Sequence, residues 1–244
     1  MEIPSEYKIK SQIVWDNFIM PGEVMELRIL NASGKIKNND YIRNATVSGY
    51  FDDFESFAKW TKEVEQELTF SGIYFTLQVI DPRLIGRAFN RLKPATLTTS
   101  DNDVRAYRWL LIDCDPVRPS DISSSEVELK AALQTRNAVC QYLESEFQFA
   151  KPLKAMSGNG YHALYQLPDM PVNDESKVFL KGILNTLSAR FDSDKVKIDR
   201  TVFNPARICK LYGSRAYKGD VVPAGYKRDE RPHRVSYIEE KGDK

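Results

Sequence analysis

The segment Trp109–Pro116, with the sequence WLLIDCDP, constrains the fold of this chain more than any other. Its apolar residues indicate a buried strand, and the proline ends that strand directly after two aspartates. Because alternate residues of a strand point to the same face, Asp113 and Asp115 should project together while Cys114 turns to the core. We therefore expect a strand whose end presents an acid pair at the edge of a sheet.

The rest of the chain supplies elements that can cover such a strand. Capping residues followed by helical apolar spacing predict helices over about 53–68, 123–147 and 173–190. β-branched and aromatic runs predict strands over 46–50, 73–80, 106–114, 153–156, 161–166 and 208–211. Residues 82–105 resemble a long polar connection. This alternation is typical of an α/β or α+β fold with mixed sheets, and 244 residues suffice for one large domain or two lobes.

Composition excludes several classes of protein. No apolar run reaches the roughly 18–20 residues of a membrane span, and the first ten residues lack the apolar core of a signal peptide. The three cysteines, Cys114, Cys140 and Cys209, are too widely spaced for a disulfide framework or a zinc knuckle, so we expect a cytoplasmic protein without zinc. Two histidines, His162 and His233, argue against a histidine-rich metal site.

The net charge of +1 hides an uneven distribution. Residues 200–234 hold nine lysines and arginines against three acids. Such a cluster favours a basic face for a nucleic-acid partner, with Arg215 and Lys218 as candidate contacts. Ordinary solvated surfaces would give the same counts.

The acid pair indicates a metal site. Two adjacent carboxylates repel each other unless a cation lies between them. Oxygen ligands suit a hard divalent cation such as Mg²⁺ or Mn²⁺. The alternative for Asp113 and Asp115 is an ordinary strand end with solvated aspartates.

The loop Ser157–His162, with the sequence SGNGYH, lies between two strand-like runs. Its glycines, Gly160 among them, permit close approach of the backbone to a ligand, and such loops can direct N–H groups at a phosphate. Ser157 and Asn159 add side-chain donors, and His162 can donate to a phosphate oxygen. The alternative is a glycine-rich hairpin turn with a hydrogen-bonded histidine.

A third segment combines one acid with two bases. Asp199 follows a short extended run and can serve as a third carboxylate ligand. Arg207 suits bidentate phosphate binding, whereas Lys210 acts as a point charge. Their offset of three residues places them on opposite faces of a regular strand, so a bulge or a strand end is needed for both to face one ligand. The alternative is a basic hairpin with a salt-bridged aspartate.

These three segments together resemble the motifs of the archaeo-eukaryotic primase superfamily, in its primase-polymerase branch. The family pattern is an acid pair on a strand, a Ser/Gly loop ending in His and a later hydrophobic-Asp pair. It is matched by Ile112–Asp115, Ser157–His162 and Ile198-Asp199, and the segment 204–214 resembles the basic stretch after the third motif. The resemblance covers about 105–219, which is roughly half of the chain.

The resemblance implies two α/β modules, the second related to an RNA-recognition sheet, with the active site in a cleft between them. We expect one catalytic domain made of a module over about 1–105, a module over about 106–219 and a basic segment over 220–244 that leads to a linker. Asp113, Asp115 and Asp199 would bind two Mg²⁺ or Mn²⁺ ions. Ser157, Asn159, Gly160, His162, Arg207 and Lys210 would bind the nucleotide. The zinc-binding element of many relatives is missing from the sequence.

The predicted activity is template-dependent nucleotidyl transfer, in which a 3′-OH attacks the α-phosphate of an NTP or dNTP and pyrophosphate leaves. The predicted partners are a DNA template and primer, no membrane, and other domains of a larger replication, repair or CRISPR-associated protein. Two alternatives stay open: a non-catalytic DNA-binding replication-initiator module on a primase-like fold, and a metal-dependent nuclease.

Overall fold

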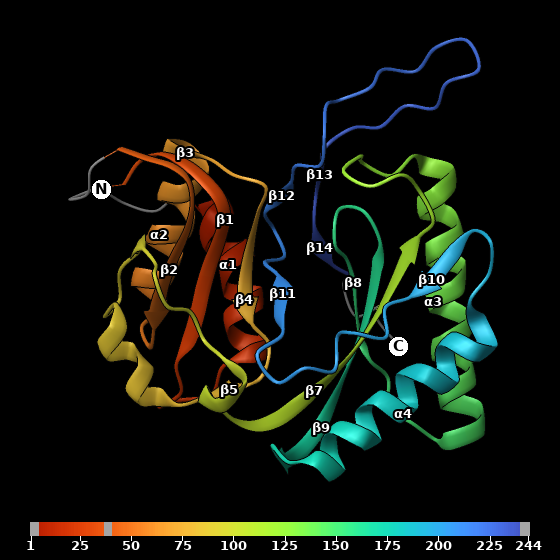
Figure 1. The fold of residues 1–244 in the computed structure, drawn as a ribbon, viewed down its shortest axis with the longest axis horizontal. Coiled ribbons are helices and arrows are strands. Elements are labelled where there is room, and N and C mark those ends of the chain that lie inside the picture. The colour runs from red at the N-terminus through yellow and green to blue at the C-terminus, as the bar shows by residue number, and fades with distance from the viewer. Residues whose placement is uncertain (1–4, 37–40, 240–244) are drawn as a thin grey trace. The chain divides into compact units, whose positions relative to one another are not determined.

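The chain forms two compact units of mixed α/β structure with antiparallel sheets, which confirms the predicted fold class. The computed structural model describes residues 5–36 and 41–239, so the tail that was predicted to lead to a linker lies partly outside the described residues. The first unit comprises the chain up to residue 107 and residues 205–214, and the second comprises 108–204 and 215 onward (Figure 1). This division differs from the expected modules because residues 205–214 return to the first unit.

The first unit is built on one sheet. Its strands follow the order β11 (Ile208–Lys210), β4 (Gly72–Thr76), β1 (Met25–Lys35), β2 (Tyr41–Phe51) and β6 (Lys93–Pro94), and β3 (Leu68–Thr69) also pairs with β1. The short β5 (Val79–Ile80) pairs with the start of β7 (Val104–Pro116). The connection predicted over 82–105 contains two 3₁₀ turns, Pro82–Arg87 and Asp101–Asp103.

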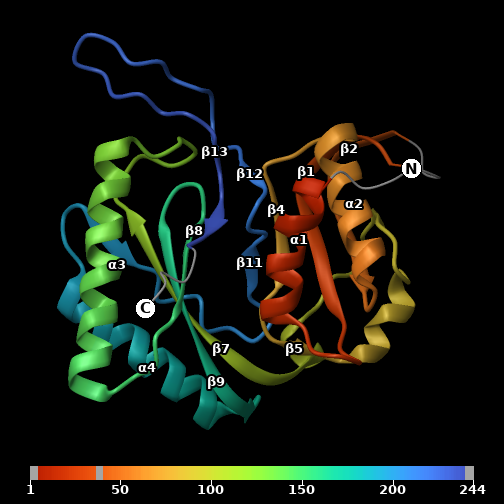
Figure 2. The same cartoon turned by 180° about the vertical axis from the view of Figure 1, so that it is seen from behind.

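Two helices, α1 (Ser5–Phe18) and α2 (Phe54–Glu67), cover one face of this sheet (Figure 2). Aromatic contacts join the two helices to each other and to the sheet: the ring centroids of Trp15 in α1 and Phe57 in α2 lie 5.2 Å apart, and those of Phe18 in α1 and Phe75 in β4 lie 4.8 Å apart. Helix α2 begins where the sequence predicted, because the Asp53 carboxylate accepts a hydrogen bond from the Ser56 N–H at 2.8 Å.

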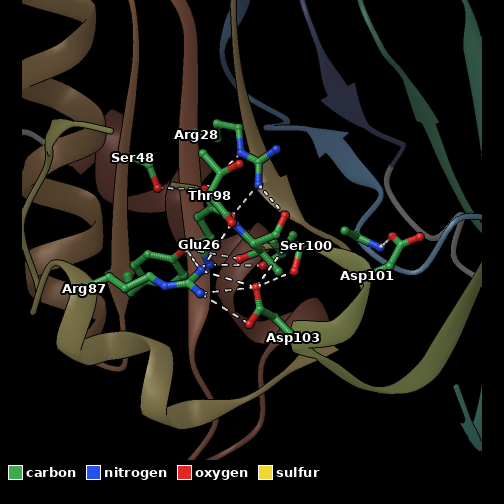
Figure 3. A network of polar contacts seen from close by, with 12 residues as sticks. Glu26, Arg28, Ser48, Arg87, Thr98, Ser100, Asp101 and Asp103 are labelled. Atoms are coloured by element: carbon green, nitrogen blue, oxygen red, sulfur yellow. Dashed lines mark hydrogen bonds and ion pairs between the residues drawn. The ribbon is translucent and has the colours of Figure 1, made fainter. Parts of the chain in front are cut away.

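Residues of β1 that alternate with its apolar side chains form a polar network in the same unit (Figure 3). The fully buried Glu26 carboxylate accepts two hydrogen bonds from Arg28, at 2.9 and 2.7 Å. The Ser48 hydroxyl donates to it at 2.6 Å and the Thr99 N–H at 3.1 Å. These bonds compensate the burial of a charge and hold the connection near Thr99 against the sheet.

The second unit contains the acid pair. Its sheet has the order β10 (Val196–Ile198), β7, β9 (Tyr161–Pro171), β8 (Leu153–Met156) and β14 (Tyr237–Ile238). Helix α4 (Asp174–Phe191) begins at the cap Asn173, as the sequence predicted, and α3 (Glu126–Phe147) begins at Ser125, two residues after the predicted start at Ser123. A separate ladder joins β12 (Arg215–Ala216) to β13 (Arg234–Val235). Among the described helices of both units, none has the length and apolar character needed to cross a membrane.

Candidate active site

The acid pair lies at the end of β7, with the strand geometry that the sequence predicted. Cys114 is fully buried, whereas the side chains of Asp113 and Asp115 are 21% and 47% exposed. Strand β10 pairs with this end of β7 and places Ile198 opposite Cys114. The two carboxylates therefore share the face of the strand that points away from the core.

The two carboxylates of the pair repel each other, which disfavours the charged form of Asp115. Burial, followed by repulsion from Asp113, raises the pKa of Asp115 to about 6. Arg118, Lys218 and His162 oppose that shift. The Arg118 guanidinium lies 3.7 Å from Asp115 Oδ1 and donates to the carbonyl of Pro116 at 2.9 Å. Because a bound cation would remove this repulsion, the acid pair fits a divalent cation chemically.

The glycine-rich loop between β8 and β9 packs against the acid pair. A Cβ built on Gly160 would lie 2.8 Å from Asp115 Oδ1 and 2.8 Å from the Cys114 carbonyl oxygen, so only glycine fits this position. Gly158 has φ +103°, and a Cβ there would lie 2.6 Å from the Cβ of Ala216. The loop thus shields one side of Asp115 from water.

Hydrogen bonds within the loop occupy the Gly160 N–H and the Ser157 hydroxyl, two donors that the sequence assigned to a phosphate. The Gly160 N–H donates to Ser157 Oγ at 3.1 Å, and the Ser157 N–H donates to the Gly160 carbonyl at 2.9 Å. The buried Asn159 Oδ1 accepts from the Ser124 N–H at 2.9 Å, and Ser124 Oγ donates to the Asn159 carbonyl at 2.6 Å. These contacts fix the loop beside the start of α3.

His162 lies on β9 with its ring buried beside the acid pair. Its side chain is 5% exposed, and Nε2 lies 3.4 Å from Asp113 Oδ1. The structure thus brings His162 and Asp113 together, as the sequence motifs implied.

The backbone of Asp199 also reaches the pair. Its N–H donates to the Asp113 carbonyl at 2.9 Å, directly after the β10–β7 ladder. Its carboxylate, however, turns to Thr201: Oδ1 accepts from the Thr201 N–H at 2.8 Å and from Thr201 Oγ1 at 2.7 Å. Over residues 5–36 and 41–239, no group of three or more His, Cys, Asp and Glu side chains is arranged to hold a metal ion. Asp113 and Asp115 fit a cation, and Asp199 fits it less well.

Arg207 and Lys210 belong to the first unit, whereas the acids belong to the second. The Arg207 carbonyl accepts a hydrogen bond from Leu77 at 3.1 Å. Lys210 is 5% exposed, and its Nζ lies 5.5 Å from the centroid of the Tyr74 ring. Burial lowers the pKa of Lys210 to about 7. The sequence did not predict that this lysine would be buried.

The candidate nucleic-acid contacts Arg215 and Lys218 are both exposed in the second unit. Arg215 donates to the His233 carbonyl at 2.9 Å. Lys218 lies close enough to the acid pair to lower the pKa of Asp115, and its carbonyl accepts from Ser123 Oγ at 3.1 Å.

Two contacts, one of Asp115 and one of Asp199, were not predicted from the sequence, although the sequence contains a pattern that indicates each. Arg118 follows Asp115 by three residues across Pro116, a spacing that allows the side chains to meet in a turn. The order Asp199-Arg200-Thr201 is typical of an Asx turn, in which the carboxylate accepts from the backbone two residues later.

Comparisons with known proteins give similarity only at the level of structure. No protein-family model matches the chain, and no curated protein sequence is significantly similar to it. The primase-polymerase AEP domain of cyanophage S-2L aligns over 95% of this chain and 88% of its own, with 11% identity and a TM-score of 0.46. The polymerase domain of Mycobacterium tuberculosis ligase D, solved in complex with DNA, aligns over 86% and 74%, with 14% identity and a TM-score of 0.46. Because both TM-scores lie below 0.5, the proposal below rests on the geometry of the acid pair.

Proposed function

We propose that this chain is a nucleotidyltransferase of the primase-polymerase kind, which extends the 3′-OH of a primer on a DNA template with NTPs or dNTPs. The observation that carries the proposal is the acid pair itself. Asp113 and Asp115 share one face of β7, and the pKa of Asp115 is raised mainly by burial and by its neighbour. Two partly buried carboxylates that repel each other are costly for stability, and catalytic sites are where such arrangements concentrate.

Each residue of the site has a stated task in this proposal. Asp113 and Asp115 would hold Mg²⁺ or Mn²⁺, which supplies charge neutralisation at the phosphate and activation of the attacking hydroxyl when it is bound. His162, whose Nε2 lies 3.4 Å from Asp113 Oδ1, would donate a hydrogen bond to a phosphate oxygen. Gly160 excludes water from one side of Asp115, since its backbone lies in contact with that carboxylate. Arg207 and Lys210 stay predicted phosphate ligands.

Primer extension on a defined template tests the proposal. We expect wild-type protein with Mn²⁺ or Mg²⁺ to extend a labelled primer, and Asp113→Asn or Asp115→Asn to lower the rate by at least about a hundredfold. Asp194→Asn, at an exposed position of the same unit, is the matched control and should leave the rate unchanged. An inactive wild-type protein, or acid variants as active as the control, would overturn the proposal.

The second candidate is a DNA-binding module without catalysis. It is favoured by one observation: the Asp199 carboxylate already accepts two hydrogen bonds from Thr201. Such a module would bind DNA as tightly after Asp113→Asn as before. It would also extend no primer under any metal condition.

A further inference from the structure

An exposed arm over residues 220–232 extends from the second unit and has no role in the proposed chemistry. Two isolated bridges, Val222 with Arg231 and Gly225 with Arg228, pair its two sides. Figure 1 shows it as a long loop that leads into β13 and extends past the elements of its unit. Residues 223–230 are all exposed. Because the arm buries few side chains, core packing does not account for its sequence.

The root of the arm is held firmly. Arg231 forms a two-pronged ion pair with Glu128, with both N–O distances at 2.8 Å, and donates to the Ser123 carbonyl at 2.7 Å. Its pKa is raised, first by the hydrogen bond to Glu128. On the other side, His233 Nε2 lies 2.8 Å from the Gly219 carbonyl oxygen. Bidentate pairs of this kind fix geometry, so the arm leaves the unit in a defined direction.

The tip of the arm combines an aromatic ring with two cations. Tyr226 is 91% exposed, the highest fraction among the large hydrophobic side chains of the described residues. The Nζ of Lys227 lies 5.4 Å from the centroid of its ring, and Arg228 follows directly. The small residues Ala224 and Gly225 precede Tyr226 and leave its ring open to solvent.

We propose that this tip binds single-stranded nucleic acid, with a base stacked on Tyr226 and phosphates held by Lys227 and Arg228. Every base offers a face to an aromatic ring, and neighbouring cations serve the backbone, so the contact needs no sequence recognition. The arm also carries acids, but Asp229 lies near Arg231 and helps to raise the pKa of that anchor. The proposal rests on the proposed function, because the arm belongs to the same unit as the acid pair and would hold a strand that the enzyme acts on.

Fluorescence anisotropy with a labelled single-stranded oligonucleotide tests this interaction without metal or nucleotide. We expect Tyr226→Ala to weaken binding about tenfold, as removal of one base–aromatic stack should, and Tyr226→Phe to bind like wild type. Replacing both Lys227 and Arg228 with Gln should make the salt dependence shallower by about 0.7 for each phosphate that the side chains no longer neutralise. The matched control is Tyr41→Ala, which removes an exposed tyrosine beside Arg43 in the first unit and should leave affinity unchanged.

Unchanged affinity of Tyr226→Ala would overturn the proposal, and so would an equal loss for a blunt duplex, since a duplex offers few free base faces. An arm that binds protein would give the first of these outcomes. The test is independent of catalysis. If the protein binds through Tyr226 but extends no primer, only the proposed nucleotidyltransferase activity is refuted. If the protein extends primers and Tyr226→Ala binds the oligonucleotide like wild type, only the proposed role of the arm is refuted.

Discussion

Glu26 in the first unit and Asp115 in the second are both carboxylates on strands, but their surroundings are opposite. Glu26 is fully buried and accepts hydrogen bonds from Arg28, Ser48 and Thr99 (Figure 3). Asp115 faces another carboxylate, and its cation, Arg118, lies 3.7 Å away. The first arrangement compensates the charge within the protein, and the second leaves room for a cation from outside.

The partners of a carboxylate, more than its burial, indicate whether it stabilises the fold or is available to bind a ligand. A carboxylate with donors on its oxygens stabilises the fold around it, and the loss of either partner leaves a buried charge. Two carboxylates that repel each other lower the stability of the fold unless a bound cation offsets the repulsion. Removal of the charge of Glu26 and removal of the charge of Asp115 should therefore change stability in opposite directions.

The largest effect on stability is expected for Glu26→Ala. It leaves the Arg28 guanidinium, whose side chain is 13% exposed, without its main partner, and we expect a loss of about 3–5 kcal/mol in the free energy of unfolding. Urea unfolding followed by circular dichroism measures the change. The exposed Glu67→Ala on α2 is the control and should stay within about 0.5 kcal/mol of wild type. A small loss for Glu26→Ala would show that the network does not hold the unit together.

Gly160→Ala should destabilise the second unit by about 1–3 kcal/mol, because the new Cβ meets Asp115 Oδ1 and the Cys114 carbonyl, both at 2.8 Å. The same change at Gly182, where a Cβ meets nothing within 4 Å, is the control and should be neutral or slightly stabilising. Thermal unfolding of the two variants compares them directly. Equal melting temperatures would mean that the loop does not pack on the acid pair.

Asp115→Asn should stabilise the metal-free protein by about 1 kcal/mol, a small value because water screens a side chain that is 47% exposed. The pKa of Asp115 is about 6 in the folded state, above its usual 3.8, so the folded state binds the extra proton between these values. The contribution of Asp115 to wild-type stability should therefore fall as pH rises from about 4 to about 6. The variant should lack that part of the pH dependence. Urea unfolding in EDTA across this range measures it, and parallel curves for the two proteins would contradict the raised pKa.

Local signals allowed much of the fold to be predicted. Asp53 and Asn173 were predicted as helix caps, and Ser125 lies in the serine run predicted to open the third helix; each of these helices begins directly after its cap. Strand β1 was missed, because Glu26 and Arg28 place buried polar groups in a central strand and the bulges after Ile29 break its alternation. The return of 205–214 to the first unit depends on pairing with β4, a contact distant in sequence that composition does not reveal.

The positions of site residues could be predicted where they follow from the alternation of side chains along a strand. They could not be predicted where they depend on contacts between segments that are distant in sequence. The common face of Asp113 and Asp115 follows from the strand alone. The burial of Lys210 against Tyr74 depends on strand register, and the bond between Asn159 and Ser124 depends on how α3 begins. The sequence of a short polar segment does not reveal whether its side chains bind a ligand or form hydrogen bonds within the protein.

Mn²⁺ binding measured by titration calorimetry tests most directly whether the acid pair serves an external cation. Wild-type protein and Glu26→Gln, a change confined to the compensated carboxylate, should bind Mn²⁺ alike once folding of the variant is verified. Asp113→Asn and Asp115→Asn should each bind at least about tenfold more weakly. Equal binding by all four proteins, or no binding by wild type at millimolar Mn²⁺, would contradict the assignment of the pair as a cation site.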